Sequence, residues 1–264
     1  MHPELTIPLI NAEIKAYTLL TILGALAFSA AALQPLKQAG VGPLRALGLI
    51  IAMVAAFLVG ARFWNVVINP GAYSGVLNWY SLRLAGFSMY GGVLGSALAL
   101  ITWARLSRMR IAPLLDAIVV PAALAFALAR VGCYLNGCCV GVITTSAWGV
   151  QFPEKSGAQE LLSGFLPFIE TALPTKRYPT QLFELVLALL GLAPALVFGR
   201  RLKDGSKFLL YGTWFTVMRL VILPLRLLPY PEIVKHTIYP ALYLTLTAFG
   251  IATLILINKE TVEV

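Results

Sequence analysis

The sequence predicts an all-α integral membrane protein, with about seven transmembrane helices around a lipid-accessible cavity and a small extracytoplasmic cap. Of its 264 residues, 59% are hydrophobic and only 12% are charged, too few charges to cover a soluble domain of this size. The mean hydropathy is +0.84, and apolar runs recur along the whole chain. These runs have the length of helices, which satisfy their own backbone hydrogen bonds in lipid.

Seven apolar runs approach the roughly 20 residues that a helix needs to cross the hydrocarbon. The first begins near Ile14 and is followed by others, so it indicates a span and not a cleaved leader. Pro121, Pro194 and Pro224 lie in or beside spans, where proline kinks a helix. Residues 1–264 are expected to form a single transmembrane domain, with 142–180 as its extracytoplasmic loop or cap. The predicted spans are 14–33, 44–61, 87–104, 111–131, 181–198, 206–223 and 238–257.

Short basic connections predict the orientation, because loops rich in Lys and Arg stay on the cytoplasmic side. If the chain has seven spans, the connection between the third and fourth spans and the connection between the fifth and sixth fall on one side. The 34–43 loop and the C-terminus lie on that side too, which is predicted to be cytoplasmic. The N-terminus and the loops 62–86, 132–180 and 224–237 then face outward. The net charge of +9 fits basic loops, and its scattered residues predict no nucleic-acid partner. The basic residues concerned are Arg105, Arg108, Arg110, Arg200, Arg201, Lys203 and Lys207.

Several ionisable residues lie inside spans or at their rims, where a charge at the helix centre costs about 2.5–3.5 kcal/mol. They are Arg62, Asp116, Arg130, Glu184, Arg219 and Arg226. One explanation is structural pairing, of Asp116 with Arg130 and of Glu184 with Arg219; another, for Arg62 and Arg226, is snorkelling to the interface. The arginines outnumber the acids, however, and a guanidinium grips phosphate bidentately. A phospholipid headgroup is therefore the predicted ligand.

Two further segments carry polar or small residues at helical spacing. Gly91 and Gly95 are four residues apart, a spacing that favours close helix packing, and Tyr90 precedes them at the outer end of the third span. Gln181 and Glu184 are three apart, so they share one helix face. That face predicts a cavity or a hydrogen-bonded seam.

Three cysteines, Cys133, Cys138 and Cys139, lie within seven positions. A zinc site usually has four ligands, and the only histidines are His2 and His236, so no metal is expected. A vicinal disulfide, inert packing and a reactive thiolate favoured by nearby Arg130 stay open as alternatives.

Four segments, taken together, resemble the bacterial prolipoprotein diacylglyceryl transferase family. Residues 130–141 are similar to its Gly-Arg-(hydrophobic)-Gly-Asn-Phe-x-Asn-Gly-Glu-x-x-Gly signature, and residues 87–95 to its Ser-Phe-His-Gly-Gly-x-x-Gly segment. Residues 178–184 resemble its His-Pro-Ser-Gln-Leu-Tyr-Glu segment, and residues 218–226 its Phe-Arg-x-x-x-Glu-Phe-x-Arg segment. The resemblance covers most of the chain.

The resemblance implies an enzyme of the bacterial cytoplasmic (inner) membrane that uses no cofactor. It would move a diacylglyceryl group from phosphatidylglycerol to the lipobox cysteine thiol of a prolipoprotein. The family's two essential arginines match Arg130 and Arg219. Its other retained positions, expected to bind substrate, match Tyr17, Arg62, Asn136, Gly141, Gln181, Glu184 and Arg226.

The departures from the family pattern concern the groups that would activate the acceptor. The family's histidine is Tyr90 here, its asparagine after the signature arginine is Cys133, and its two glutamates are Cys138 and Leu223. Tyr90 and Cys133 are therefore the predicted catalytic partners of the two arginines, with Glu184 as another candidate base. Two alternatives stay open: a paralogue with a non-lipoprotein acceptor, and a non-catalytic phospholipid-binding or transport protein.

Overall fold

The computed structural model spans the chain, and the structure describes residues 4–7, 12–68, 88–152, 176–228 and 232–262. Seven helical stretches within these residues are long and apolar enough to cross a membrane, which confirms the predicted all-helical class. The helices are α1 (Ala16–Gln38), α2 (Pro43–Ile68), α4 (Met89–Leu106), α5 (Ile111–Asn136), α7 (Thr180–Leu190), α8 (Leu192–Phe198), α9 (Ser206–Ile222) and α10 (Tyr239–Val262). Helices α7 and α8 together make the fifth span.

Several helices extend further than the apolar runs predict, and in two of them the extension includes predicted site residues. Helix α5 continues to Asn136, so the residues between 132 and 136 are helical and do not begin a loop. Helix α2 continues to Ile68, which moves Arg62 out of the predicted 62–86 loop and onto a helix. In both cases polar or aromatic residues follow the apolar run, and hydropathy alone does not register that the helical backbone hydrogen bonds go on.

Short strands complete the described elements. Strand β1 (Glu4–Ile7) pairs antiparallel with β2 (Ala12–Lys15), an N-terminal hairpin that the sequence analysis did not predict. Strand β3 (Val150–Gln151) pairs antiparallel with β4 (Lys176–Arg177) inside the predicted cap. Residues 153–175, the rest of that cap, lie outside the described residues.

The chain divides into two compact units, of which the first comprises residues 1–28 and 119–264 and the second residues 29–118. In the second unit, α2 and α4 meet through glycines. A Cβ at Gly60 would collide with the carbonyl of Gly91, a Cβ at Gly91 with the carbonyl of Gly60, and a Cβ at Gly95 with the carbonyl of Ala56. The predicted role of Gly91 and Gly95 in helix packing is thereby confirmed. We call this contact the α2–α4 seam.

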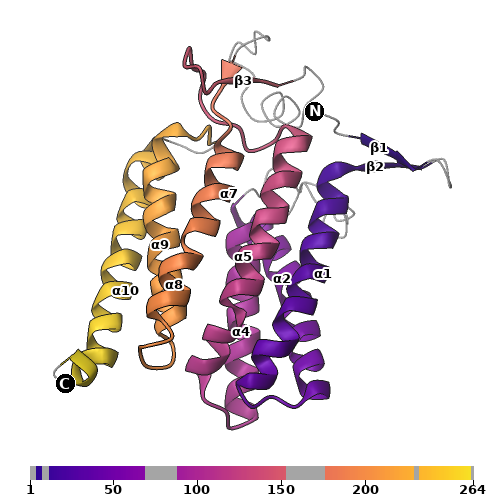
Figure 1. Ribbon diagram of the computed structural model, residues 1–264. Helices are drawn as coiled ribbons and strands as arrows, with labels where there is room; N and C mark the ends of the chain where they lie inside the picture. Colours follow the sequence, from indigo (N-terminus) through magenta and orange to yellow (C-terminus); the bar gives the residue numbers. More distant parts are fainter. Residues whose placement is uncertain (1–3, 8–11, 69–87, 153–175, 229–231, 263–264) are drawn as a thin grey trace. The chain divides into compact units, whose positions relative to one another are not determined.

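In the first unit, Figure 1 shows α7 and α8 end to end, with α9 beside them and α10 beside α9. Helix α7 ends at Gly191, where any Cβ would collide with the indole of Trp214 on α9. The Trp214 Nε1–H donates to the backbone carbonyl of Leu187, 2.7 Å away. Between α9 and α10, the hydroxyls of Thr216 and Thr247 are hydrogen-bonded at 2.9 Å. Polar contacts therefore hold these helices together where lipid gives no hydrophobic drive for their association.

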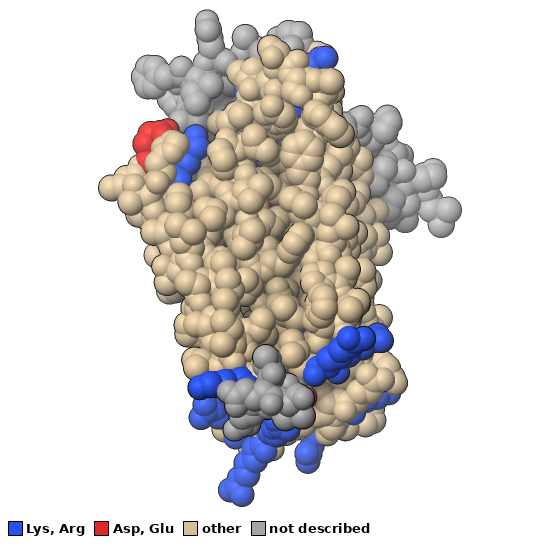
Figure 2. Space-filling view, turned by 60° about the vertical axis from the view of Figure 1, so that its left-hand side comes forward, with Lys and Arg blue, Asp and Glu red and all other residues tan. Residues whose placement is uncertain are grey.

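The outward faces of the first unit suit a hydrocarbon environment. On α10, Phe249 is 66% exposed and Leu256 is 72% exposed. Figure 2 shows uncharged surface along the visible helices, with Lys and Arg gathered near helix ends. Arg200 and Lys203 lie in the short connection from α8 to α9, where the Lys203 N–H donates to Asn258 near the end of α10 at 2.9 Å. This distribution is typical of a multi-pass membrane protein.

Candidate functional site

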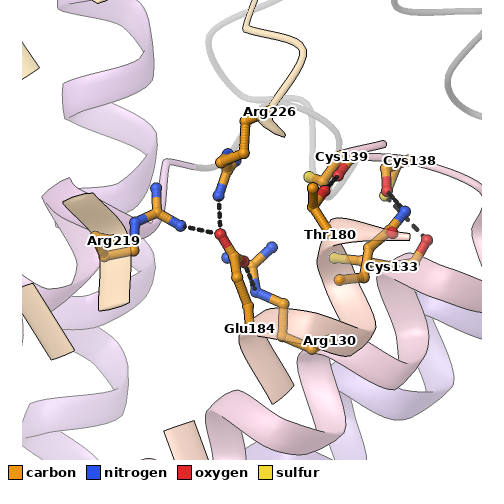
Figure 3. A network of polar contacts seen from close by, with 9 residues as sticks. Arg130, Cys133, Cys138, Cys139, Thr180, Glu184, Arg219 and Arg226 are labelled. Carbon is orange, nitrogen blue, oxygen red and sulfur yellow. Dashed lines mark hydrogen bonds and ion pairs between the residues drawn. The ribbon is translucent and has the colours of Figure 1, made fainter. Parts of the chain in front are cut away.

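Glu184, on the first turns of α7, is the centre of a buried ion-pair cluster (Figure 3). Its Oε2 lies 2.8 Å from the Nε of Arg130 on α5, and its Oε1 lies 2.6 Å from the Nη1 of Arg219 on α9. Arg226, which follows the 3-10 turn η3 (Leu223–Leu225), also donates to Oε1 through its Nη1. Side chains from α5 and from the continuous stretch of α9 and η3 therefore meet at one carboxylate of α7, and we call this group the Glu184 cluster.

The Glu184 cluster is buried, and within the described residues it sets three guanidinium groups against one carboxylate. Glu184 is 1% exposed, and the exposed fractions of Arg130, Arg219 and Arg226 are 7%, 5% and 8%. The predicted pairing of Glu184 with Arg219 is confirmed, whereas snorkelling of Arg226 is wrong, because its guanidinium is buried against the same carboxylate. Three guanidinium groups face one carboxylate, so the cluster is suited to hold a further anion.

A small backbone arrangement fixes the position of Arg226. Residue Gly141 bridges Arg226 in antiparallel fashion, and its N–H donates to the carbonyl of Tyr178 at 2.9 Å. A Cβ at Gly141 would lie 2.6 Å from the carbonyl oxygen of Leu225 and 2.7 Å from that of Tyr178. Only glycine fits between these two carbonyl groups. The predicted site residue Gly141 therefore allows the close backbone contact that positions Arg226.

Aromatic side chains support the other end of the Glu184 cluster. The guanidinium carbon of Arg130 lies 4.7 Å from the ring centre of Phe126, one turn earlier on α5. Phe126 in turn packs edge-on against Phe215 of α9, with ring centres 5.2 Å apart. The cation–π contact and the ring pair fix Arg130 between α5 and α9.

The three cysteines converge where α5 ends (Figure 3). Cys133 lies on the last turns of α5, and the Cys138 N–H donates to its carbonyl at 3.0 Å. Gly137 and Cys139 have positive φ angles of 67° and 58°, which turns the chain back sharply. The three sulfur atoms lie within 4.8 Å of one another, and no disulfide joins them. We call these residues the cysteine turn.

Helix α7 holds the cysteine turn in place through its first two residues. The Thr180 hydroxyl donates to the carbonyl of Cys139 at 2.9 Å, and the Gln181 Nε2 donates to the carbonyl of Cys138 at 2.6 Å. Hydrogen bonds from Cys133 and Cys138, with the charges of Arg130 and Arg226, hold the pKa of Cys139 well below its usual range. Hydrogen bonding with Cys133 and Cys139 raises the pKa of Cys138.

Most of the predicted site residues belong to the first unit. The Glu184 cluster and the cysteine turn bring together Arg130, Cys133, Gly141, Gln181, Glu184, Arg219 and Arg226. Tyr17 lies on α1, which packs against α5 at Gly132, where a Cβ would be 3.4 Å from the Tyr17 Cα. Asn136 is the last residue of α5. Arg62 and Tyr90 belong to the second unit, on α2 and in the first turn of α4.

Two buried residues that the sequence analysis did not place in the site are hydrogen-bonded to it. Arg177 is 5% exposed, and its Nη1 donates to the carbonyl of Gly141 at 3.5 Å. Burial lowers the pKa of Arg177. Thr180 is 1% exposed and bonds the cysteine turn. In the sequence, Arg177 resembles an ordinary residue at the end of a loop, and Thr180 one at the start of a helix. Only the folded chain places them against the carbonyls of Gly141 and Cys139, to which they donate hydrogen bonds.

The chain matches a family of known proteins over nearly its whole length. The family described as prolipoprotein diacylglyceryl transferase matches residues 5–257. The chain is similar to the phosphatidylglycerol–prolipoprotein diacylglyceryl transferase of Bifidobacterium adolescentis, at 29% identity over 189 residues, which are 69% of this chain and 56% of that protein. The protein of the same name from Dehalococcoides mccartyi is 29% identical over 178 residues, 66% of this chain and 59% of the relative.

A shorter match has higher identity. The phosphatidylglycerol–prolipoprotein diacylglyceryl transferase 2 of Clostridium perfringens is 34% identical over 123 residues, which are 46% of this chain and 43% of that protein. The chain thus spans a little over half the length of the first two relatives and less than half of this one.

Proposed function

The chain belongs to the prolipoprotein diacylglyceryl transferase family, and on that premise we propose that it moves a diacylglyceryl group from phosphatidylglycerol to the lipobox cysteine thiol of a prolipoprotein. The observation that carries the proposal is the Glu184 cluster, in which three buried arginines share one carboxylate. Arginine binds phosphate through directed, paired hydrogen bonds, so this group of side chains suits the phosphate of a phospholipid headgroup.

The donor binds through its phosphate. Guanidinium groups make directed, paired hydrogen bonds to phosphate oxygens, and these bonds gain strength where water is excluded. Glu184 holds the guanidinium groups of Arg130 and Arg219 beside one another, where both can bind the phosphate of one headgroup. Glu184 thereby acts as a positioning residue, since a carboxylate engaged by three guanidinium groups is a poor proton acceptor.

The reaction exchanges one bond for another at a glycerol carbon of the donor. The acceptor sulfur forms a carbon–sulfur bond, the carbon–oxygen bond to phosphate breaks, and glycerol phosphate leaves with the electron pair. The leaving group gains negative charge as the bond breaks, and Arg130 and Arg219 stabilise it. A single preplaced donor of this kind contributes about 3–4 kcal/mol to such a transition state.

The acceptor thiol also has to lose its proton, and Tyr90 and Cys133 are the residues proposed to assist. Both stand where the resembled motifs have other side chains. Tyr17, Arg62 and Asn136 are proposed to contact the substrates, following the positions retained in those motifs.

The positive-inside rule supports an orientation with the α4–α5 and α8–α9 connections on the cytoplasmic side. In the first unit, the Glu184 cluster lies near the opposite helix ends, at the start of α7 and the end of α9. We therefore propose that the enzyme takes its donor from the outer leaflet of a bacterial cytoplasmic membrane, with the N-terminus outside.

A second candidate function keeps the donor and changes the acceptor. Tyr90, Cys133 and Cys138 all differ from the resembled motifs at positions associated with the acceptor, whereas Arg130 and Arg219 match. A paralogue that delivers the diacylglyceryl group to another thiol or an alcohol would have this pattern.

The test is transfer by purified protein from labelled phosphatidylglycerol to a lipobox peptide, with small thiols and alcohols offered in parallel. We expect Arg130→Ala and Arg219→Ala each to lower transfer by about 100-fold or more, from the loss of one transition-state donor. The matched control is Arg200→Ala, which removes an exposed arginine of the same unit and should leave transfer unchanged.

The outcomes separate the candidates. Transfer to the peptide supports the lipoprotein acceptor, and transfer only to another acceptor supports the paralogue. Tight phospholipid binding without any glycerol phosphate release would reject both in favour of a non-catalytic lipid-binding protein. Full activity of Arg130→Ala would overturn the role of the Glu184 cluster.

A further inference from the structure

We propose that Cys133, Cys138 and Cys139 bind a thiophilic divalent metal ion of the Zn(II) class through three thiolates, and that the open fourth position receives the acceptor thiol. Metal binding stands on the geometry of the cysteine turn alone. The part concerning the acceptor rests on the proposed transferase function.

The spacing of the sulfur atoms suits one shared metal ion. They lie within 4.8 Å of one another. Three thiolates bound at about 2.3 Å to one tetrahedral zinc ion have sulfurs about 3.8 Å apart, so only a small closure is required. A disulfide would use two of the three sulfurs and leave the third beside it, whereas a metal ion uses all of them.

The backbone is arranged to aim these sulfurs at one point. Cys139 has a φ of 58°, a conformation that a non-glycine residue keeps only where its surroundings enforce it. Thr180 and Gln181 provide that restraint by binding the carbonyls of Cys139 and Cys138. Support of this kind around the ligands orients metal sites generally.

The sequence analysis expected no metal because a zinc site usually has four ligands and the only histidines are His2 and His236. That argument holds for structural zinc, which is closed by four protein ligands. Catalytic zinc sites have three protein ligands and keep one position for water or substrate. Three cysteines therefore meet the requirement of the catalytic kind, and the positive charges of Arg130 and Arg226, which act on Cys139, favour an anionic metal–thiolate centre.

An open metal position would replace the missing base. A thiol that coordinates zinc is deprotonated outright, so the acceptor thiol would release its proton to solvent on binding. Its sulfur would then form the bond to the glycerol carbon, and the electron pair of the broken carbon–oxygen bond would leave with glycerol phosphate. The metal stays Zn(II) throughout, and no oxidant or reductant is needed.

Metal binding is tested without any activity measurement. Reduced, chelator-stripped protein is loaded with Zn(II), challenged with a competing chelator, and assayed for zinc by elemental mass spectrometry. We expect one zinc ion per chain, and each of Cys133→Ser, Cys138→Ser and Cys139→Ser should weaken binding by at least about 100-fold. The matched control carries all three serine substitutions together with Ala147→Cys, which supplies one exposed thiol elsewhere in the chain. This control should retain no zinc.

Two results would overturn the metal site. One is equal zinc retention by the wild type and the triple-serine control. The other is a wild-type protein isolated with a disulfide in the cysteine turn that, once reduced, retains no zinc.

The role in acceptor activation has its own readout. Zinc-stripped protein should transfer to a lipobox peptide about 100-fold more slowly than zinc-loaded protein, the typical contribution of an acid–base group, and reloading should restore the rate. Zinc-independent transfer would overturn the acceptor role while the transferase proposal stands. Zinc bound at one per chain with no transfer in any state would reject the transferase proposal and the acceptor role but keep the metal site.

Discussion

The α2–α4 seam and the Glu184 cluster join helices in opposite ways. In the seam, Gly60 and Gly91 bring two backbones into direct contact, and the fit is one of shape. In the Glu184 cluster, one carboxylate draws three guanidinium groups from separate segments. Lipid offers no hydrophobic drive for helix association, so a membrane protein has to use either close packing or polar contacts.

The seam and the Glu184 cluster illustrate the distinction between a contact that only joins helices and one that can also bind a ligand. The seam is complete in itself, because each glycine meets the partner backbone and leaves no group in need of a ligand. In the Glu184 cluster, three guanidinium groups share one carboxylate. Buried charge is costly in a membrane, and the proposed phosphate site would give these arginines a function.

The largest effect is expected from a substitution that removes the carboxylate of the Glu184 cluster. Glu184→Gln leaves three buried guanidinium groups without their counter-charge, and loss of one member of a buried pair costs about 3–5 kcal/mol. We expect a free energy of unfolding in detergent lowered by that amount, together with loss of transfer. Denaturant titration followed by circular dichroism measures the first, and the lipobox-peptide assay the second.

The matched control removes an exposed carboxylate. Glu232 pairs with His236 at 2.7 Å, yet its side chain is 79% exposed, so Glu232→Gln should change the free energy of unfolding by less than about 0.5 kcal/mol. Equal stability of the two variants would show that the Glu184 cluster does not hold the helices together.

The second effect separates position from charge. Gly141→Ala keeps every charged group but forces a Cβ against the carbonyls of Leu225 and Tyr178, which displaces Arg226. A misplacement of about 1 Å in a binding group can lower a rate about 100-fold, and we expect a loss of that size in transfer. Gly212→Ala, where nothing lies within 4 Å of the new Cβ, serves as the control and should keep full activity.

The third effect tests the seam. Gly91→Ala forces a Cβ into the backbone of Gly60, and overpacking of this kind costs about 1–3 kcal/mol. Gly48→Ala, on the same helix as Gly60 with open space around its Cβ, should be neutral or slightly stabilising. Thermal unfolding of both variants in one detergent measures the difference, and similar midpoints would contradict a seam that depends on shape.

The smallest effect is expected from removing one of the two hydrogen bonds by which α7 holds the cysteine turn. Thr180→Val keeps the shape of the side chain and removes the bond to the Cys139 carbonyl, at a cost of about 1 kcal/mol. Thr145→Val, at an exposed position, is the control. Stability measured by denaturant titration should fall only for the first, and the zinc affinity of the cysteine turn should fall with it.

The seven spans could be predicted because hydropathy is a local sum along the chain. Errors arose where a helix continues past its apolar run, as α5 does to Asn136 and α2 to Ile68. The N-terminal hairpin was missed because four-residue strands leave little pattern to detect. Among the described site residues, Glu184 and Arg219 could be paired in advance, whereas the contribution of Arg226 to the same carboxylate could not.

The residues by themselves determined that the chain crosses a membrane and that it carries arginines a bilayer would not tolerate without a purpose, because both properties depend on composition within short windows. The tertiary structure alone decided that one carboxylate gathers three of those arginines and that Arg177 returns to Gly141. It also decided that three sulfurs converge beside Thr180 and Gln181. Such meetings depend on the rotation of each helix and the path of each turn, which are set by packing between segments far apart in the chain.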